Sequence, residues 1–153
     1  MNTRLIIFVC TGNICRSPMA EYLFRRHLTS QPGWKVASAG VFAVNGMPAS
    51  IHAVKALAEM GIDLHTHRSQ ALTRDLIDSA SLIVVMTASH KNQVCSFFPD
   101  AKDKVHVLKS FGDDSGDVED PIGASLEIYK RIRDEITTAL WSLDKYIENL
   151  KKT

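Results

Sequence analysis

The stretch Phe8-Val9-Cys10-Thr11-Gly12-Asn13-Ile14-Cys15-Arg16-Ser17-Pro18 decides the fold of this chain. The stretch begins at the end of an apolar run over residues 5–9. This run is rich in β-branched and aromatic side chains and predicts a buried strand. Pro18 suits the first turn of a helix, and Ser17 stands where an N-cap is expected. A strand, a tight loop and a helix therefore follow one another. Backbone N–H groups at such a junction bind anions, phosphate among them.

The side chains of this loop match the chemistry of phosphoryl transfer. Cys10 begins the loop and Arg16 closes it, with five residues between them. A helix N-terminus, a guanidinium and the hydroxyl of Ser17 favour the thiolate, which is the nucleophilic form of cysteine. Arg16 offers a planar fork of donors that fits two phosphate oxygens. Gly12 and Asn13 suit backbone angles that other residues resist. We expect phosphate to be bound by Thr11, Gly12, Asn13, Ile14, Cys15, Arg16 and Ser17.

The rest of the chain alternates between strands and helices. Further strands are predicted over residues 34–38, 81–86 and 104–108. Helices are predicted over residues 51–60, 74–79, 88–98 and 124–150, with Thr73 and Thr87 as caps of the second and third. This alternation predicts an α/β fold, a parallel sheet with helices on both faces. In such sheets ligands bind beyond the carboxyl ends of the strands, where the loop after the first strand lies.

Composition is that of one globular protein. The 153 residues are 45% hydrophobic and 23% charged, which predicts a single domain over residues 1–153. A formal net charge of +1 argues against a nucleic-acid partner. No apolar run has the length of a membrane span, and no signal-peptide pattern is present, so no membrane partner is expected. Three cysteines, two of them in one loop, are not a disulfide framework and favour a cytoplasmic location.

The chain resembles the low-molecular-weight protein tyrosine phosphatases. Their phosphate-loop pattern stands here from Val9 to Pro18, and the likeness continues through Ser38-Ala39-Gly40, His65 with Arg68, and Asp120-Pro121. The resemblance implies a four-stranded parallel sheet with flavodoxin-like winding. It also implies a catalytic set of Cys10 as nucleophile, Arg16 and the general acid Asp120, acting on a phosphorylated protein without metal or cofactor. An acid there fits the chemistry, because a departing tyrosyl oxygen needs a proton.

The same resemblance assigns supporting roles. Ser38 and His65 are expected to hold Asn13 in place, together with Ser17. Cys15 is a redox partner that could form a reversible disulfide with Cys10, or it could simply pack beneath the loop. The six histidines lack metal-ligand spacing, and His67 and His90 are expected at the surface.

Three activities remain open at this point. Phosphotyrosine hydrolysis is the leading interpretation, and protein arginine phosphatases of bacilli are also similar over much of the chain. Those enzymes carry a threonine where this loop has Ile14, whose apolar side chain favours an aromatic ring. Many tyrosine phosphatases, however, have an aromatic residue where this chain has Ile122. Arsenate reductase uses the same loop, but its thioredoxin-coupled form needs two further relay cysteines, and this chain has only Cys95 beyond the loop.

Overall fold

A single parallel sheet organises the computed structural model, which describes residues 3–27, 33–112 and 116–151. The strands of the sheet, in the order β2-β1-β3-β4, all run parallel. They are β1 (Arg4–Cys10), β2 (Trp34–Gly40), β3 (Leu82–Val85) and β4 (Val105–Val107). The predicted four-stranded α/β fold with flavodoxin-like winding is confirmed.

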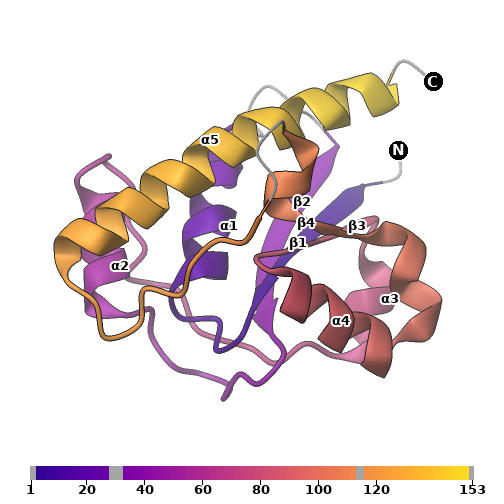
Figure 1. Ribbon diagram of the computed structural model, residues 1–153, viewed down its shortest axis with the longest axis horizontal. Helices are drawn as coiled ribbons and strands as arrows, with labels where there is room; N and C mark the ends of the chain where they lie inside the picture. The colour runs from indigo at the N-terminus through magenta and orange to yellow at the C-terminus, as the bar shows by residue number, and fades with distance from the viewer. Residues whose placement is uncertain (1–2, 28–32, 113–115, 152–153) are drawn as a thin grey trace.

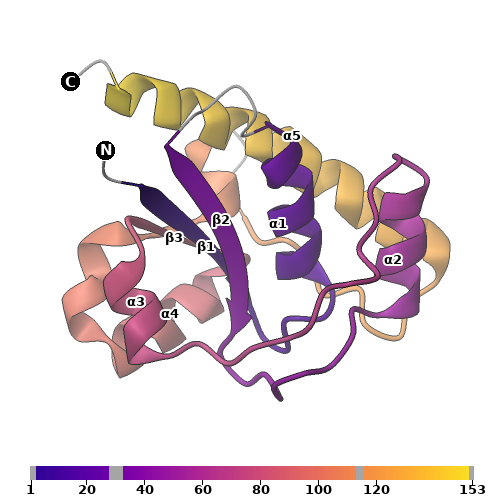
Figure 2. The same cartoon turned by 180° about the vertical axis from the view of Figure 1, so that it is seen from behind.

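Helices cover both faces of the sheet (Figures 1 and 2). One face carries α1 (Arg16–His27), α2 (Ile51–Ala58) and α5 (Leu126–Lys151). The other carries α3 (Arg74–Ser79) and α4 (Ala88–Phe97). Two short 3₁₀ helices flank β4, namely η2 (Pro99–Lys104) and η3 (Leu108–Phe111). Among the described residues, no helix is both long enough and apolar enough to cross a membrane.

Strand β1 is buried on both faces, as its continuous apolar run predicts. Ile6 and Phe8 pack with α1, α2 and α5, whereas Ile7 and Val9 pack with α3 and α4, and all four side chains are fully buried. Side chains alternate between the two faces of a strand, so a run that is apolar throughout fits a strand between two helical layers. Cys10 continues the alternation on the α1 side.

The predicted boundaries agree with the structure to within about two residues. Strand β2 extends to Gly40 rather than ending at residue 38, because it pairs with β1 along its whole length. Helix α1 begins at Arg16, so Ser17 lies inside the first turn and the N-cap prediction for it is wrong. The caps of α3 and α4 are confirmed, since the side chains of Thr73 and Thr87 accept hydrogen bonds from backbone N–H groups.

The strand order places the Cys10 loop at a natural ligand-binding position. The chain runs from β1 to β2 on one side and later returns to β3 on the other, so the order reverses beside β1. Cys10 is the last residue of β1, and it pairs with Gly40 at the end of β2. Ligands of such sheets bind at this reversal, outside the carboxyl ends of the strands.

Candidate active site

The thiol of Cys10 is buried and in contact with a hydroxyl group. Its Sγ lies 2.9 Å from Oγ of Ser17 in the first turn of α1. Nδ2 of Asn13 donates to the same Ser17 oxygen at 2.8 Å. Since Ser17 accepts that hydrogen, its own hydroxyl hydrogen is free to point at the sulfur. A hydroxyl donor and the N-terminus of α1 both stabilise negative charge on Cys10.

Asn13 is the central support of the loop. It has a left-handed backbone with φ of 58° and is fully buried. Its Nδ2 also donates to Ser38 Oγ at 2.9 Å, and its Oδ1 accepts from the backbone N–H of Gln70 at 3.0 Å. The positive φ predicted for this part of the loop thus falls on Asn13, and Gly12 does not share it. Asparagine tolerates this conformation better than other residues with a side chain.

The end of β2 leaves room for the loop to pass close by. The backbone N–H groups of Val41 and Phe42 donate to the carbonyl oxygens of Cys10 and Thr11, both at 3.0 Å. A Cβ atom at Gly40 would lie only 2.4 Å from the Thr11 carbonyl oxygen. Glycine is therefore required at position 40, because any side chain would displace the loop.

Arg16 connects the loop to the segment that carries Asp120. The guanidinium is buried; Nη1 donates to the Val118 carbonyl oxygen at 3.0 Å, and Nη2 lies 3.6 Å from Oδ2 of Asp120. Asp120 itself is about half exposed, and its Oδ1 accepts from the backbone N–H of Ile122 at 3.1 Å. The predicted nucleophile, arginine and acid thus lie at one place, although Asp120 is far from the other two in the sequence.

A cavity of about 130 Å³ opens where these residues meet. It is lined by Cys10, Thr11, Gly12, Ile14, Cys15, Arg16, Asp120 and Ile122. Its lining combines the thiol of Cys10 and the charged groups of Arg16 and Asp120 with the apolar side chains of Ile14 and Ile122. Such a lining suits a phosphate that carries an apolar group, because it offers a sulfur nucleophile, a guanidinium and two apolar side chains.

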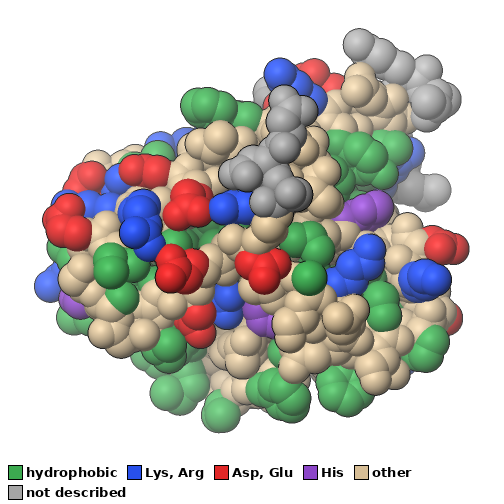
Figure 3. Space-filling model, in the orientation of Figure 1, with side chains coloured by type: hydrophobic (Ala, Val, Ile, Leu, Met, Phe, Trp, Pro, Cys, Tyr) green, Lys and Arg blue, Asp and Glu red, His purple; other side chains and the backbone are tan. Residues whose placement is uncertain are grey.

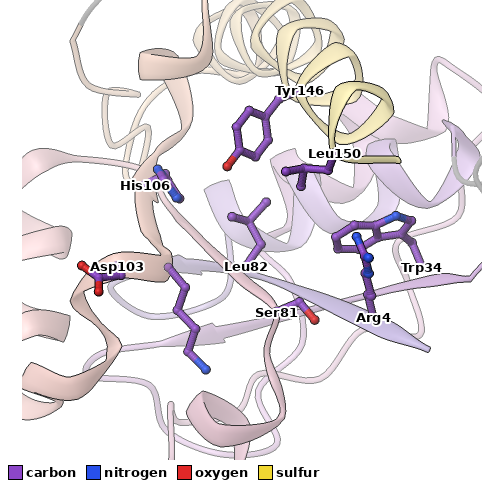
Figure 4. A pocket seen from close by; sticks show the side chains of 9 residues that line it. Arg4, Trp34, Ser81, Leu82, Asp103, His106, Tyr146 and Leu150 are labelled. Atoms are coloured by element: carbon purple, nitrogen blue, oxygen red, sulfur yellow. The ribbon is translucent and has the colours of Figure 1, made fainter. Parts of the chain in front are cut away.

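A second cavity, of about 240 Å³, lies at the amino-terminal end of the sheet (Figure 4). Arg4, Trp34 and Leu82, from the starts of three strands, line it together with Tyr146 of α5. The two basic side chains of this lining, Arg4 and Lys104, already have partners within the protein. Arg4 lies over the ring of Trp34, and Lys104 Nζ donates to two carbonyl oxygens at the end of α3. This cavity is at the opposite end of β1 from Cys10.

His67, and not His65, contacts the loop, so the expected supporting role of His65 is wrong. Nε2 of the buried His67 lies 2.8 Å from the Asn13 carbonyl oxygen. His65 is exposed, and its backbone N–H donates to Oδ1 of Asp63. This Asx turn directs His65 outwards and leaves the histidine two residues later to face the site. Only Thr66 separates the two histidines in the sequence, and a loop has no hydrophobic periodicity that could show which of them is buried.

His90 is a further site residue that sequence reasoning missed. It was expected at the surface, but it is 3% exposed, and its Nε2 lies 2.8 Å from Oγ1 of Thr11. Burial, helped by the charge of Arg16, lowers the pKa of His90 to about 4, so the ring is neutral near pH 7. The signal that could have revealed it is its spacing from Val94, because these two residues form the buried side of α4.

Cys15 is a free, buried thiol that lines the same cavity as Cys10. Its Sγ lies 3.3 Å from the hydroxyl of Tyr129 in α5 and 3.5 Å from Oγ of Ser50. Burial is the main cause that raises the pKa of Cys15, and the same cause raises that of Tyr129 to about 12. Cys15 is therefore a protonated thiol near neutral pH, unlike an activated nucleophile.

Within the described ranges, no group of three or more His, Cys, Asp or Glu side chains is arranged to hold a metal ion. The positive field at the cavity comes instead from Arg16 and from the start of α1. Both kinds of group bind phosphate oxygens in other proteins.

Comparison with known proteins places the chain in a family. A model described as "Low molecular weight phosphotyrosine protein phosphatase" matches residues 5–153. A protein-arginine-phosphatase of Geobacillus stearothermophilus is 46% identical over 148 residues, which are 95% of each chain. A probable low molecular weight protein-tyrosine-phosphatase of Ralstonia solanacearum, EpsP, is 42% identical over 118 residues, which are 77% of this chain and 78% of that protein.

Solved structures give the same result. The crystal structure of a low molecular weight protein tyrosine phosphatase from T. tengcongensis has a TM-score of 0.89 and 41% sequence identity, and the match covers 94% of this chain and 99% of that one. The cavity lies on the loop whose sequence pattern carried the resemblance. The chain is a phosphatase and belongs to the low molecular weight phosphotyrosine protein phosphatase family.

Proposed function

We propose that this phosphatase hydrolyses phosphotyrosine in proteins through a covalent phosphocysteine on Cys10. In the first step, the Cys10 thiolate attacks phosphorus as the bond to the tyrosyl oxygen breaks. Arg16 and the loop amides stabilise the negative charge on the equatorial oxygens. The contacts of Cys10 with Ser17 and the start of α1 support its role as nucleophile.

Asp120 supplies and recovers the proton. It protonates the departing tyrosyl oxygen in the first step, and in the second it accepts a proton from the water that attacks the phosphocysteine. Inorganic phosphate leaves, and Cys10 is restored as a thiolate. The half-exposed position of Asp120 at the cavity supports this role, because the carboxyl group can exchange protons with solvent between the two steps.

The choice of tyrosine rests on one observation, the apolar wall formed by Ile14 within the cavity lining. Ile14 and Cys10 line the same cavity, so a side chain whose phosphate reaches Cys10 lies near Ile14. An isoleucine offers dispersion contact to an aromatic face and no hydrogen-bond acceptor to a guanidinium. Ile122 adds a second apolar side chain to the lining of the cavity.

Exposed apolar side chains beside the cavity support a protein substrate. Figure 3 shows hydrophobic side chains along the lower edge of the molecule, the edge at which the strands end. Phe42, Val44 and Met47 on the segment after β2, and Ile51 at the start of α2, are all about half exposed or more. Apolar patches of this kind mark surfaces that contact other proteins.

Phosphoarginine is the second candidate substrate. It is favoured by the relatives named protein-arginine-phosphatase, which match this chain over nearly its whole length. The carboxylate of Asp120 lies at the cavity and could pair with a guanidinium. A phosphoarginine side chain brings N–H donors that need acceptors, and Ile14 offers it only an apolar surface.

The test compares rates on matched phosphotyrosine and phosphoarginine peptides. We expect the native enzyme to prefer phosphotyrosine. Ile14→Thr should shift the ratio of kcat/KM values towards phosphoarginine by about tenfold or more, because a hydroxyl contact to the guanidinium contributes roughly 1.5 kcal/mol. Ile14→Val is the matched control, since it shortens the side chain without adding a hydroxyl. A native preference for phosphoarginine would make the second candidate the correct one, and arsenate reduction measured alongside tests the oxidoreductase alternative.

A further inference from the structure

His90 reaches the phosphate loop from a distant part of the chain. Its Nε2 lies 2.8 Å from Oγ1 of Thr11, 79 residues away in sequence. The imidazole sits in the first turn of α4, where its own backbone N–H donates to the Thr87 hydroxyl at 3.0 Å. The ring is nearly fully buried, so both its position and its direction are set by packing.

Thr11 is the residue directly after the nucleophile, and its side chain contacts His90. The carbonyl oxygen of Thr11 accepts from Phe42, and its hydroxyl meets His90. Thr11 therefore has two restraints, one on the backbone from the end of β2 and one on the side chain from α4. Its position matters for catalysis, because small displacements of a phosphate-binding group lower the rate strongly.

The start of α4 also holds the segment that carries the general acid. The backbone N–H of Val118 donates to the Met86 carbonyl oxygen at 2.9 Å, and that of Ala88 donates to Oδ1 of Asp117 at 2.8 Å. The residues from Met86 to His90 thus contact both halves of the site, the loop of Cys10 and the segment of Asp120.

We propose that His90 is a positioning residue for this phosphatase, which fixes Thr11 relative to Cys10 and to the acid segment through the Thr11–His90 hydrogen bond. The inference rests on the proposed phosphatase mechanism at Cys10. His90 itself acts through Thr11 and does not touch the phosphate. Nδ1 of His90 has no hydrogen-bond partner in the part of the chain that the structure describes, so Nε2 provides its one polar contact there.

Neutral His90 suits this role in either tautomer. If Nε2 carries the hydrogen it donates to Thr11, and if Nδ1 carries it the Thr11 hydroxyl donates to Nε2. The ring is neutral near pH 7 because burial and Arg16 lower its pKa, against smaller opposite effects of Asp117 and Asp120. A second positive charge beside Arg16 is thereby avoided.

Paired variants separate positioning from general packing. The amide nitrogen of glutamine can take the place of Nε2, whereas that of asparagine takes the place of Nδ1 and cannot reach Thr11. His90→Asn should therefore lower kcat about tenfold on a phosphotyrosine peptide with little change in KM, and His90→Gln should stay near the native rate. Thr11→Val should reproduce the loss, and Thr11→Ser should largely avoid it.

The double variant tests whether Thr11 and His90 act through the same hydrogen bond. Because both single changes remove the same hydrogen bond, Thr11→Val combined with His90→Asn should be about as slow as either alone. His106→Leu is the matched control, since His106 is a partly buried histidine of β4 beside the second cavity, packed on Phe111 and Tyr146. It should leave kcat unchanged.

The outcomes distinguish this inference from the proposed function. A native enzyme without phosphatase activity on any phosphopeptide would overturn the proposed function. An active native enzyme in which the losses from Thr11→Val and His90→Asn multiply would overturn the role of His90 alone. Should His90→Asn fail to fold, equal kcat values for Thr11→Val and Thr11→Ser would overturn it as well.

Discussion

Cys10 and Asp120 line one cavity in contrasting environments. The sulfur is buried and held by Ser17, whereas the carboxylate is about half exposed and lies near Arg16. A nucleophile gains from a fixed position among donors, and an acid that must recover its proton gains from contact with water. The environments of the two residues match the roles proposed for them.

Replacing Cys10 by serine should separate binding from turnover. Cys10→Ser removes the thiolate, and we expect phosphopeptide turnover to fall to the background rate. Inorganic phosphate should still bind, because Arg16 and the loop amides are unchanged. Steady-state kinetics and calorimetric phosphate titration provide the two measurements. Activity within about tenfold of the native enzyme would show that Cys10 is not the nucleophile.

Asp120→Asn should affect leaving groups unequally. An asparagine cannot donate a proton to the departing oxygen, so aryl phosphates whose phenols have a high pKa should slow most. Activated esters such as nitrophenyl phosphate need less protonation and should slow least. The measurement is kcat/KM across a series of aryl phosphates. Equal slowing throughout the series would indicate that Asp120 only orders the loop around Arg16.

At the scale of elements, the pattern of apolar runs was sufficient to predict the sheet. Four short apolar runs separated by helical periods specify a parallel sheet, and a loop directly after the first strand must lie at its carboxyl edge. Boundaries shifted by one or two residues where pairing between strands, rather than local sequence, decides the end. Gly40 illustrates this, since β2 continues to it because β1 continues to Cys10.

Side-chain support from distant segments was harder to predict. His67 and His90 reach the loop only because the chain folds back on itself, and the spacing of His90 from Val94 on α4 is the single local sign of burial for either of them. The loop around His67 shows no hydrophobic periodicity that would indicate which side chains are buried. Helix α4 is mostly polar, with His90 and Val94 as its buried residues. Local sequence therefore predicts the loop of Cys10 well. It does not predict which distant residues contact and support that loop.

Helix α5 supplies Tyr129, which contacts the second cysteine of the loop. Under mild peroxide we expect Cys10 to be oxidised to a sulfenic acid, and the Cys15 thiol to displace water from it and form a disulfide. Inactivation should then be reversed by a thiol reductant. Cys15→Ser should make the same treatment irreversible, with sulfinic or sulfonic acid at Cys10 by mass spectrometry. Finding these acids in the native enzyme instead would refute the protective role of Cys15.

At the scale of the whole molecule, the site draws on every strand-to-helix connection at one edge of the sheet. The loop after β1 contacts the segment after β2, the residues before α3 and the start of α4, and α5 closes the far side through Tyr129. The contacts that stabilise the fold therefore also set the geometry of the site. His90 is one example, because it is buried and contacts Thr11 of the loop.

Acidification should reveal this link in the free energy of unfolding. His90 has a pKa of about 4 in the folded protein against 6.5 for the free side chain. Below pH 6.5, His90 binds a proton in the unfolded chain but stays neutral in the folded protein. The free energy of unfolding therefore falls as the pH is lowered towards 4. Between about pH 7 and pH 5 this single group should cost about 2 kcal/mol.

His90→Gln isolates that contribution, because glutamine keeps the reach to Thr11 but does not titrate. Urea unfolding at both pH values should show that the native protein loses about 2 kcal/mol more than the variant on acidification. Other groups, such as the partly buried His106 whose pKa burial also lowers, are common to both proteins and cancel in the difference. Equal losses would mean that His90 accepts a proton in the folded state, which requires a partner for Nδ1. That result would also mean that burial and the charge of Arg16 do not keep the His90 ring neutral.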